Sequence, residues 1–93
     1  MNPNNQSACI NPDQVYYTHV VDANTILFHM KDDKVWKNSM KTPCPGLKFH
    51  GFSYVTHFDE LCSDRVPIRV IETGETCTLG TFTRYSPPVS NPG

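Results

Sequence analysis

The chain has 93 residues and a formal net charge of −1. A balance this close to neutral provides no general attraction to nucleic acid or to an anionic membrane surface, and we expect no nucleic-acid partner. No apolar run reaches the roughly 18 residues that a membrane-crossing helix needs, so we expect no membrane span, and the size allows one small domain.

The first half of the domain, which follows a polar tail at residues 1–8, is predicted to form three antiparallel strands. Short runs rich in Val, Ile, Thr, Tyr and Phe alternate with polar turn sequences, which is typical of half-buried strands. In the second run Ile26, Phe28 and Met30 fall on one face, as a core-facing strand requires. We expect these strands at residues 15–21, 25–31 and 35–38.

The second half begins with a loop and continues with three further strands. Residues 39–51 carry two prolines, two glycines and Cys44, which predict an ordered loop, with one helical turn at most, pinned by the cysteine. Further on, Val66, Ile68 and Val70 point one way, and Pro67 between them indicates an edge strand or a strand start. We expect strands at residues 52–57, 65–71 and 77–84, a turn of helix at 59–62 and a hairpin turn at 73–76.

Six short strands in so small a domain predict an all-β fold. A small disulfide-stapled antiparallel β-barrel or roll over residues 9–85 is the expected architecture, because curling a short sheet removes most of its exposed edges. Residues 86–93 are polar and rich in proline, so we expect a second disordered tail there. We expect the protein to be a monomer.

The cysteines indicate where the protein works. They are Cys9, Cys44, Cys62 and Cys77, and none belongs to a Cys-x-x-Cys pair. An even number at wide spacing in a short chain predicts two disulfides and an oxidising compartment, so we expect a periplasmic or secreted protein. We expect that its leader peptide is missing from this chain and that Met1 was added as a start codon for expression. The alternative is a cytosolic protein with four free thiols.

The pairing of the four cysteines is open, since three connectivities are possible. We favour Cys44 with Cys62, around one intervening strand, and Cys9 with Cys77, which would lock the N-terminal arm onto the last strand. A domain of about 70–80 residues rarely gains more than about 3–5 kcal/mol from its core, and a bridge contributes a similar amount. Loss of either disulfide is therefore expected to unfold the protein or nearly so.

Several motifs, taken in order, resemble a family of short bacterial exported proteins whose domain has no assigned function. The more specific ones are Cys-Pro-Gly-Leu at residues 44–47, Leu-Cys-Ser at 61–63 and Cys-x-Leu-Gly-x-Phe at 77–82. The resemblance covers most of residues 9–84. It implies a precursor with a leader peptide, located in the periplasm or envelope, and it supplies no catalytic residues. The segment 64–67 departs from the family's shorter link into the fifth strand.

Metal binding is an alternative role for the central cysteines. Cys44, His50, His57 and Cys62 would offer four zinc ligands within 19 residues, but without the close pairs typical of zinc sites. The two histidines also flank a predicted strand at an odd separation, which places them on opposite faces. Zinc would need the two sulfurs as thiolates, so it and a disulfide at these cysteines exclude each other. We expect no metal and no other cofactor.

Aromatic residues provide the main binding hypothesis. If Trp36 and Tyr54 are exposed, they would form with Phe49 and Lys37 a patch suited to stacking on a glycan or to packing against a protein. The alternative is that Trp36 is a central core residue. The stretch 34–58 also has four lysines and no acid, which could attract an anionic polymer but is more simply a solvated strand-loop region.

No catalytic motif accompanies these features, since the chain has neither a Gly-x-Ser-x-Gly elbow nor a phosphate-binding loop. We therefore expect a non-enzymatic exported protein, a binding or structural accessory module whose partner is an envelope protein or a glycan. One alternative is a secreted inhibitor that presents the loop 42–48 to an enzyme. The other is the zinc-stabilised domain.

Overall fold

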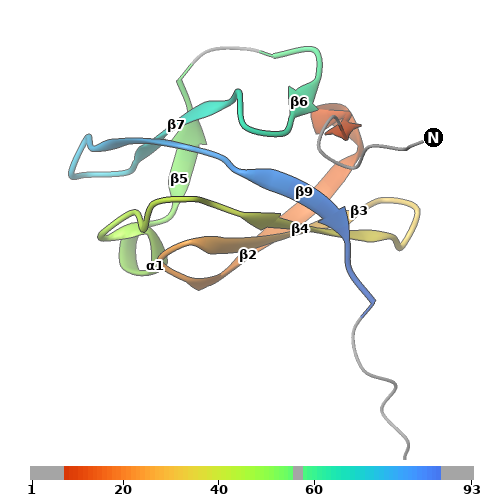
Figure 1. The fold of residues 1–93 in the computed structure, drawn as a ribbon, viewed down its shortest axis with the longest axis horizontal. Helices are drawn as coiled ribbons and strands as arrows, with labels where there is room; N and C mark the ends of the chain where they lie inside the picture. The colour runs from red at the N-terminus through yellow and green to blue at the C-terminus, as the bar shows by residue number, and fades with distance from the viewer. Residues whose placement is uncertain (1–7, 56–57, 87–93) are drawn as a thin grey trace, which may run out of the picture.

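The structure, a computed structural model, describes residues 8–55 and 58–86, and it confirms an all-β protein with two disulfides. Short strands dominate the described residues (Figure 1). They are β1 (Cys9–Ile10), β2 (Val15–Asp22), β3 (Thr25–Met30), β4 (Val35–Ser39), β5 (Phe52–Tyr54), β6 (Leu61–Cys62), β7 (Pro67–Val70), β8 (Thr76–Thr78) and β9 (Thr81–Arg84). A 3₁₀ turn spans Pro12–Gln14, and the helix α1 spans Leu47–His50. The expected tails lie outside the described residues, apart from Ala8 and Ser86.

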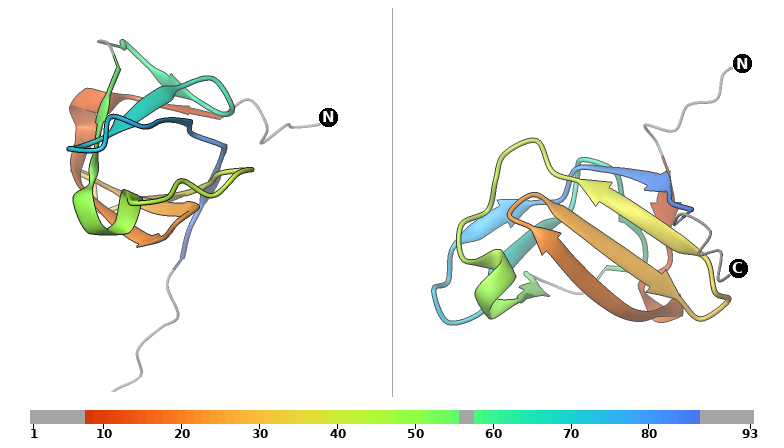
Figure 2. Two further views of the ribbon diagram at one scale, coloured as in Figure 1. Left: turned by 90° about the vertical axis from the view of Figure 1, so that its left-hand side faces the viewer. Right: turned by 90° about the horizontal axis from the view of Figure 1, so that it is seen from below.

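The strands form three antiparallel sheets. β2, β3, β4 and β9 make a four-stranded sheet, β5, β7 and β8 make a three-stranded sheet, and β1 pairs with β6. The two larger sheets lie in separate layers on either side of the core (Figures 1 and 2). The ladders between described residues belong to three separate sheets, so they do not by themselves close a barrel.

The core lies between the two larger sheets and is rich in aromatic rings. Phe28 of β3 and Phe82 of β9 are fully buried, with ring centres 5.3 Å apart. The predicted inward faces are confirmed: Ile26 and Met30 are buried beside Phe28, and the alternating residues of β7 are buried from the opposite layer. Burial of one face is what imposes the period-two pattern on these strands.

The strand expected at residues 77–84 is in fact two strands in two sheets. β8 ends at Thr78, β9 begins at Thr81, and the backbone between them crosses from one layer to the other. Gly80 permits the crossing, because a Cβ at this position would overlap the carbonyl oxygen of Ser39. The side chain of Asn38 then holds both backbone groups of Gly80, donating through Nδ2 to its oxygen (2.9 Å) and accepting at Oδ1 from its N–H (2.7 Å).

Other boundaries also differ from expectation. The turn of helix expected at 59–62 is wrong, since the last two of these residues form β6 and pair with β1. The strand expected at 65–71 begins only at Pro67. Proline, which has no backbone N–H to donate, is tolerated at the first residue of a strand. β5 covers the first half of the strand expected at 52–57, and residues 56–57 lie outside the described part. The loop expected at 39–51 is confirmed from residue 40 onward, since Ser39 ends β4, and it contains α1 as its helical turn.

Candidate functional site

The disulfides join Cys9 to Cys62 and Cys44 to Cys77, and no described cysteine is free. The pairing that we favoured from the sequence is therefore wrong, as is the alternative with four free thiols. The first bridge follows from the pairing of β1 with β6, which places Cys9 directly opposite Cys62. The second follows from the loop before α1, where the Cys44 N–H donates to the oxygen of Ala23 (2.7 Å) and the buried sulfur meets Cys77 of β8.

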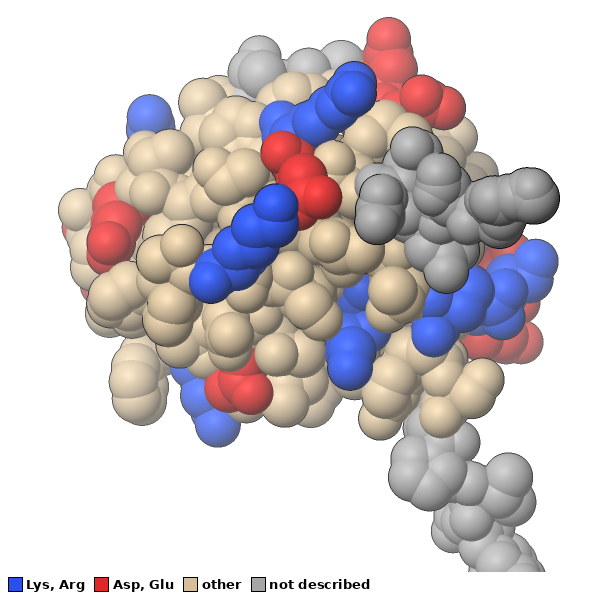
Figure 3. Space-filling view, viewed as in Figure 1, with Lys and Arg blue, Asp and Glu red and all other residues tan. Residues whose placement is uncertain are grey.

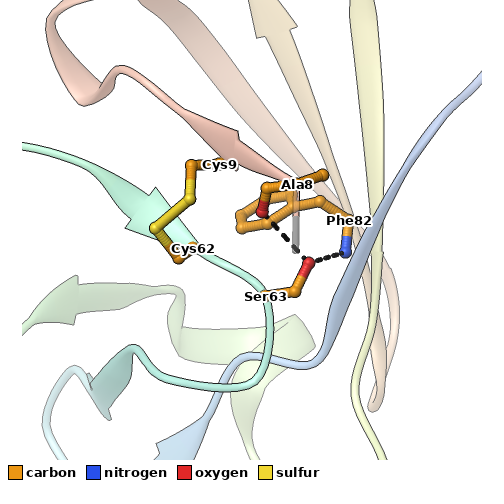
Figure 4. Close-up of a disulfide and its surroundings, with 5 residues drawn as sticks. All are labelled: Ala8, Cys9, Cys62, Ser63 and Phe82. Carbon is orange, nitrogen blue, oxygen red and sulfur yellow. Dashed lines mark hydrogen bonds between the residues drawn. A yellow bond between two sulfur atoms is a disulfide. The ribbon is translucent and has the colours of Figure 1, made fainter. Parts of the chain in front are cut away.

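The first disulfide belongs to a cluster that we call the N-terminal clasp, formed by Ala8, Cys9, Cys62, Ser63 and Phe82 (Figure 4). Ser63 is at its centre, because its Oγ donates to the Ala8 oxygen (3.2 Å) and accepts from the Phe82 N–H (2.9 Å). β9 is the last strand of its sheet, so the clasp satisfies a donor on an otherwise open edge. The clasp thus joins three distant parts of the chain.

Together with the neighbouring Glu60, the disulfide of the clasp forms a group of residue types that bind metals. Ligand atoms of Cys9, Glu60 and Cys62 lie within 4.8 Å of one another. The two sulfurs are bonded to each other, however, and a disulfide offers no thiolate to a metal ion. The zinc site considered from the sequence meets the same obstacle, because Cys44 and Cys62 are both in disulfides, and His57 lies outside the described residues.

The residues of the expected aromatic patch do not share one surface. Trp36 is half-buried against the core, and the guanidinium carbon of Arg84 lies 5.6 Å from the centre of its ring. Lys37 follows Trp36 in β4 and so lies on the opposite face of the sheet. Tyr54 packs against the core from β5, where burial raises the pKa of its hydroxyl. Phe49 stands on α1 with 85% of its surface exposed.

A different aromatic cluster is exposed on β2 and β3. Tyr17 stacks on its ladder partner His29, with ring centres 4.2 Å apart and ring planes 6° from parallel. Tyr16 packs edge-on against Tyr17, with ring centres 5.4 Å apart, and 72% of its surface is exposed. We call Tyr16, Tyr17 and His29 the aromatic surface.

A β-bulge explains how two consecutive tyrosines come together. In a regular strand, neighbouring residues face opposite sides of the sheet. Here the register shifts, with Val15 opposite Met30 and Tyr17 opposite His29, so that Tyr16 is the extra residue between them. The sequence signal for this cluster is the tyrosine pair itself, which interrupts the period-two pattern; our patch hypothesis did not include it.

Two surface hollows adjoin the aromatic surface and share Tyr16, Met30 and Asp33. The larger has a volume of about 430 Å³ and is completed by Lys31. The smaller, of about 180 Å³, reaches Lys34 and the other two rings of the aromatic surface. We call the two hollows together the groove, which combines ring faces and a thioether with charged groups of both signs.

A further hollow of about 280 Å³ lies between the proline loop and β8. Its lining consists of Thr42, Pro43, Glu75, Thr76, Cys77 and Thr78. Two residues of that loop, Cys44 and Leu47, are fully buried. The segment 42–48 is thus anchored in the core at two points, which leaves less of it for presentation to an enzyme.

Side-chain contacts connect the basic central stretch with acidic residues that follow it in the sequence. The Lys41 ammonium lies 3.8 Å from the Asp64 carboxylate, and the His50 ring lies 3.5 Å from the carboxylate of Glu72. On the face shown in Figure 3, positive and negative side chains are interspersed. The uneven distribution of charge along the sequence is therefore partly evened out by the fold.

Within the described residues, no helix has the length and apolar character required to cross a membrane. Comparison of the chain with protein-family models, curated proteins and solved structures found no match.

Proposed function

We propose that the protein is an exported, non-enzymatic accessory module of the cell envelope, which binds its partner through the aromatic surface and the groove. The observation that carries the proposal is the exposed pair Tyr16 and Tyr17, with Tyr17 stacked on the half-buried His29. Aromatic side chains are enriched where proteins bind partners, because they offer a large rigid contact area together with a polar group. In this chain a bulge directs two of them outward together.

The chemistry of the disulfides supports the location that we propose. Two disulfides in a small domain are typical of periplasmic and extracellular proteins, where thiols are kept oxidised. The sequence resemblance to short exported bacterial proteins points the same way. The groove, with its rings, ammonium groups and carboxylate, supports a role in noncovalent recognition.

Chemical footprinting tests the binding surface while the partner is still unidentified. The intact protein is nitrated with tetranitromethane, alone and after incubation with soluble and insoluble envelope fractions, and each tyrosine is quantified by mass spectrometry. We expect an envelope fraction to protect Tyr16 and Tyr17 from nitration. The same fraction should retain the wild-type protein and release the Tyr16→Ser/Tyr17→Ser variant.

The matched control is Phe49→Ser, which removes an even more exposed aromatic residue from α1. This variant should be retained like the wild-type protein if the aromatic surface is what binds. Unchanged nitration of both tyrosines with every fraction would contradict the proposal, as would equal loss of retention in the two variants.

A further inference from the structure

The charged residues of the groove are Lys31, Asp33 and Lys34, which come from one turn, and the charges of that turn cancel once Asp32 is included. Residues 31–34 are Lys-Asp-Asp-Lys, two positive and two negative side chains, all exposed. A strongly anionic or cationic ligand would meet a like charge at this turn as well as an opposite one. The groove is therefore better suited to an uncharged ligand that both donates and accepts hydrogen bonds.

Two of these charged groups have no protein partner among the described residues. Lys34 and Asp32 form an ion pair with a separation of 3.8 Å. Within the described part of the chain, neither the Lys31 ammonium nor the Asp33 carboxylate has a hydrogen bond or an ion pair, and both residues line the larger hollow with Tyr16. A donor, an acceptor and an exposed ring thus border the same open space.

The backbone that carries the Asp33 carboxylate is held in place. Asp33 has a φ of 73°, in the left-handed region, and its N–H donates to the oxygen of Met30 (3.1 Å). Aspartate and asparagine tolerate this conformation better than most residues. The turn is also tied to the start of β2, because the Lys31 N–H donates to the Gln14 oxygen (2.8 Å). The turn and the bulged tyrosine therefore belong to one connected part of the molecule.

We propose that the groove binds an uncharged saccharide, an inference that rests on the proposed function and names its ligand class. A sugar ring has an apolar C–H face that can lie on the Tyr16 ring, and hydroxyl groups that both donate and accept. The Asp33 carboxylate accepts from two of these hydroxyls, and the Lys31 ammonium donates to a third. Tyr17 and His29 extend the platform toward a second sugar unit in the smaller hollow.

The test uses three saccharides as probes, namely chitotriose, cellotriose and maltotriose, each titrated into the full ¹⁵N-labelled chain. Open sites that contact one side of a ligand bind weakly, so we expect a dissociation constant on the order of 1 mM for at least one probe. The amide signals of Tyr16, Tyr17 and Asp33 should shift. Tyr16→Ala should weaken binding about tenfold, and Tyr16→Phe, which keeps the ring, should bind nearly as the wild type.

Asp33→Asn gives a second, independent measurement, since asparagine keeps the left-handed backbone but removes the charge of the acceptor. We expect about threefold weaker binding, because charge-assisted hydrogen bonds are the stronger ones. Phe49→Ala, remote from the groove in sequence and on α1, should change nothing. Each variant is exposed at the substituted position, so its spectrum shows directly whether it remains folded.

The saccharide proposal is overturned if no probe shifts these signals at about ten times the expected dissociation constant, or if Tyr16→Ala and Asp33→Asn bind as the wild type does. Footprinting separates that outcome from failure of the proposed function. Protection of Tyr16 and Tyr17 by an envelope fraction without any saccharide response would retain the binding surface and assign it a ligand of another class. Absence of both signals would remove both proposals.

Discussion

The two disulfides secure different ends of the molecule, and they do so in different surroundings. Figure 1 shows α1 and the β7–β8 hairpin at one end and β6 at the other. The bridges span sequence separations of 33 and 53 residues, and in the chain-entropy model each contributes about 4 kcal/mol, because loop length enters only as a logarithm. Cys44 is fully buried, however, whereas Cys9 is exposed. We therefore expect the stabilisation from each disulfide to depend on the surroundings of its cysteines.

Removal of the Cys44–Cys77 disulfide should have the largest effect on stability. In Cys44→Ala/Cys77→Ala the loss of buried sulfur adds to the loss of the cross-link, so we expect destabilisation of about 5 kcal/mol and an unfolded chain at 25 °C. Urea denaturation followed by far-ultraviolet circular dichroism measures it. A variant that unfolds cooperatively with less than about 2 kcal/mol lost would show that the buried location adds nothing to the cross-link.

Loss of the hydrogen bonds between Asn38 and Gly80 should have the second-largest effect on stability. Asn38→Ala leaves the N–H and the oxygen of Gly80 without their buried side-chain partner and opens a small cavity, so we expect a loss of about 4 kcal/mol. The control is Ser39→Ala at the next, exposed position of β4, with an expected change below about 0.5 kcal/mol. Similar values for the two variants would mean that Asn38 does not hold the crossing.

Removal of the Cys9–Cys62 disulfide should destabilise the whole molecule less. In Cys9→Ala/Cys62→Ala the two-residue strand β1 can fray while the larger sheets persist, so we expect a loss of about 2 kcal/mol, below the chain-entropy value. Hydrogen exchange should speed up at residues 8–10 and 61–63 and stay slow in β3. Exposure also predicts an order of reduction: a mild thiol reductant should open Cys9–Cys62 before Cys44–Cys77. Uniformly faster exchange, or the reverse order, would contradict this.

The elements that the sequence predicts best are those whose pattern comes from burial on one side. Ile26, Phe28 and Met30 alternate because β3 lies on the core, and the same reason makes β7 recognisable. β1 and β6 have two residues each, too few for any period to show. Cys9 and Cys62 are brought together by the pairing of these two strands. Because the sequence does not reveal these strands, it could not identify the disulfide partners.

A change of phase marks the change of sheet within residues 77–84. Leu79 and Phe82 are both buried although they are three positions apart, so the period of two is broken between them, around Gly80. Our prediction of one strand overlooked this break, and the crossing itself depends on the close approach to Ser39. The exposure of Trp36, on which the binding hypothesis rested, is decided by distant segments. The tyrosine pair on β2 differs, since its break in the pattern is visible in the sequence itself.

Ser63 tests the hydrogen bonds of the clasp separately from its disulfide. Ser63→Ala removes the acceptor of the Phe82 N–H and one of the two donors to the Ala8 oxygen, while the Ser63 backbone N–H still donates to it (3.0 Å). We expect a loss of about 1.5 kcal/mol, mainly from the buried N–H of β9. Denaturation of Ser63→Ala in the wild-type and in the Cys9→Ala/Cys62→Ala backgrounds gives the coupling between the two parts of the clasp. A strictly additive result would show that they act independently.

Tyr54 should give the smallest effect, confined to alkaline solution. Burial raises its pKa above the ordinary value of 10.0, so the folded protein keeps this proton more tightly than the unfolded chain does. Unfolding therefore releases a proton once the pH exceeds the ordinary value, and the stability contribution is lost as the pH rises through the raised pKa.

Phenylalanine at this position keeps the ring and removes the titration. The difference in unfolding free energy between Tyr54→Phe and the wild type, measured in guanidinium at about pH 8 and about pH 10.5, should shift in favour of the variant at the higher pH. Every other ionisable group is common to the two proteins and cancels from this difference. An unchanged difference would mean that the Tyr54 hydroxyl ionises as easily in the three-stranded sheet as in the unfolded chain. This sheet, which carries Cys77, would then be more open to water at β5 than its packing indicates.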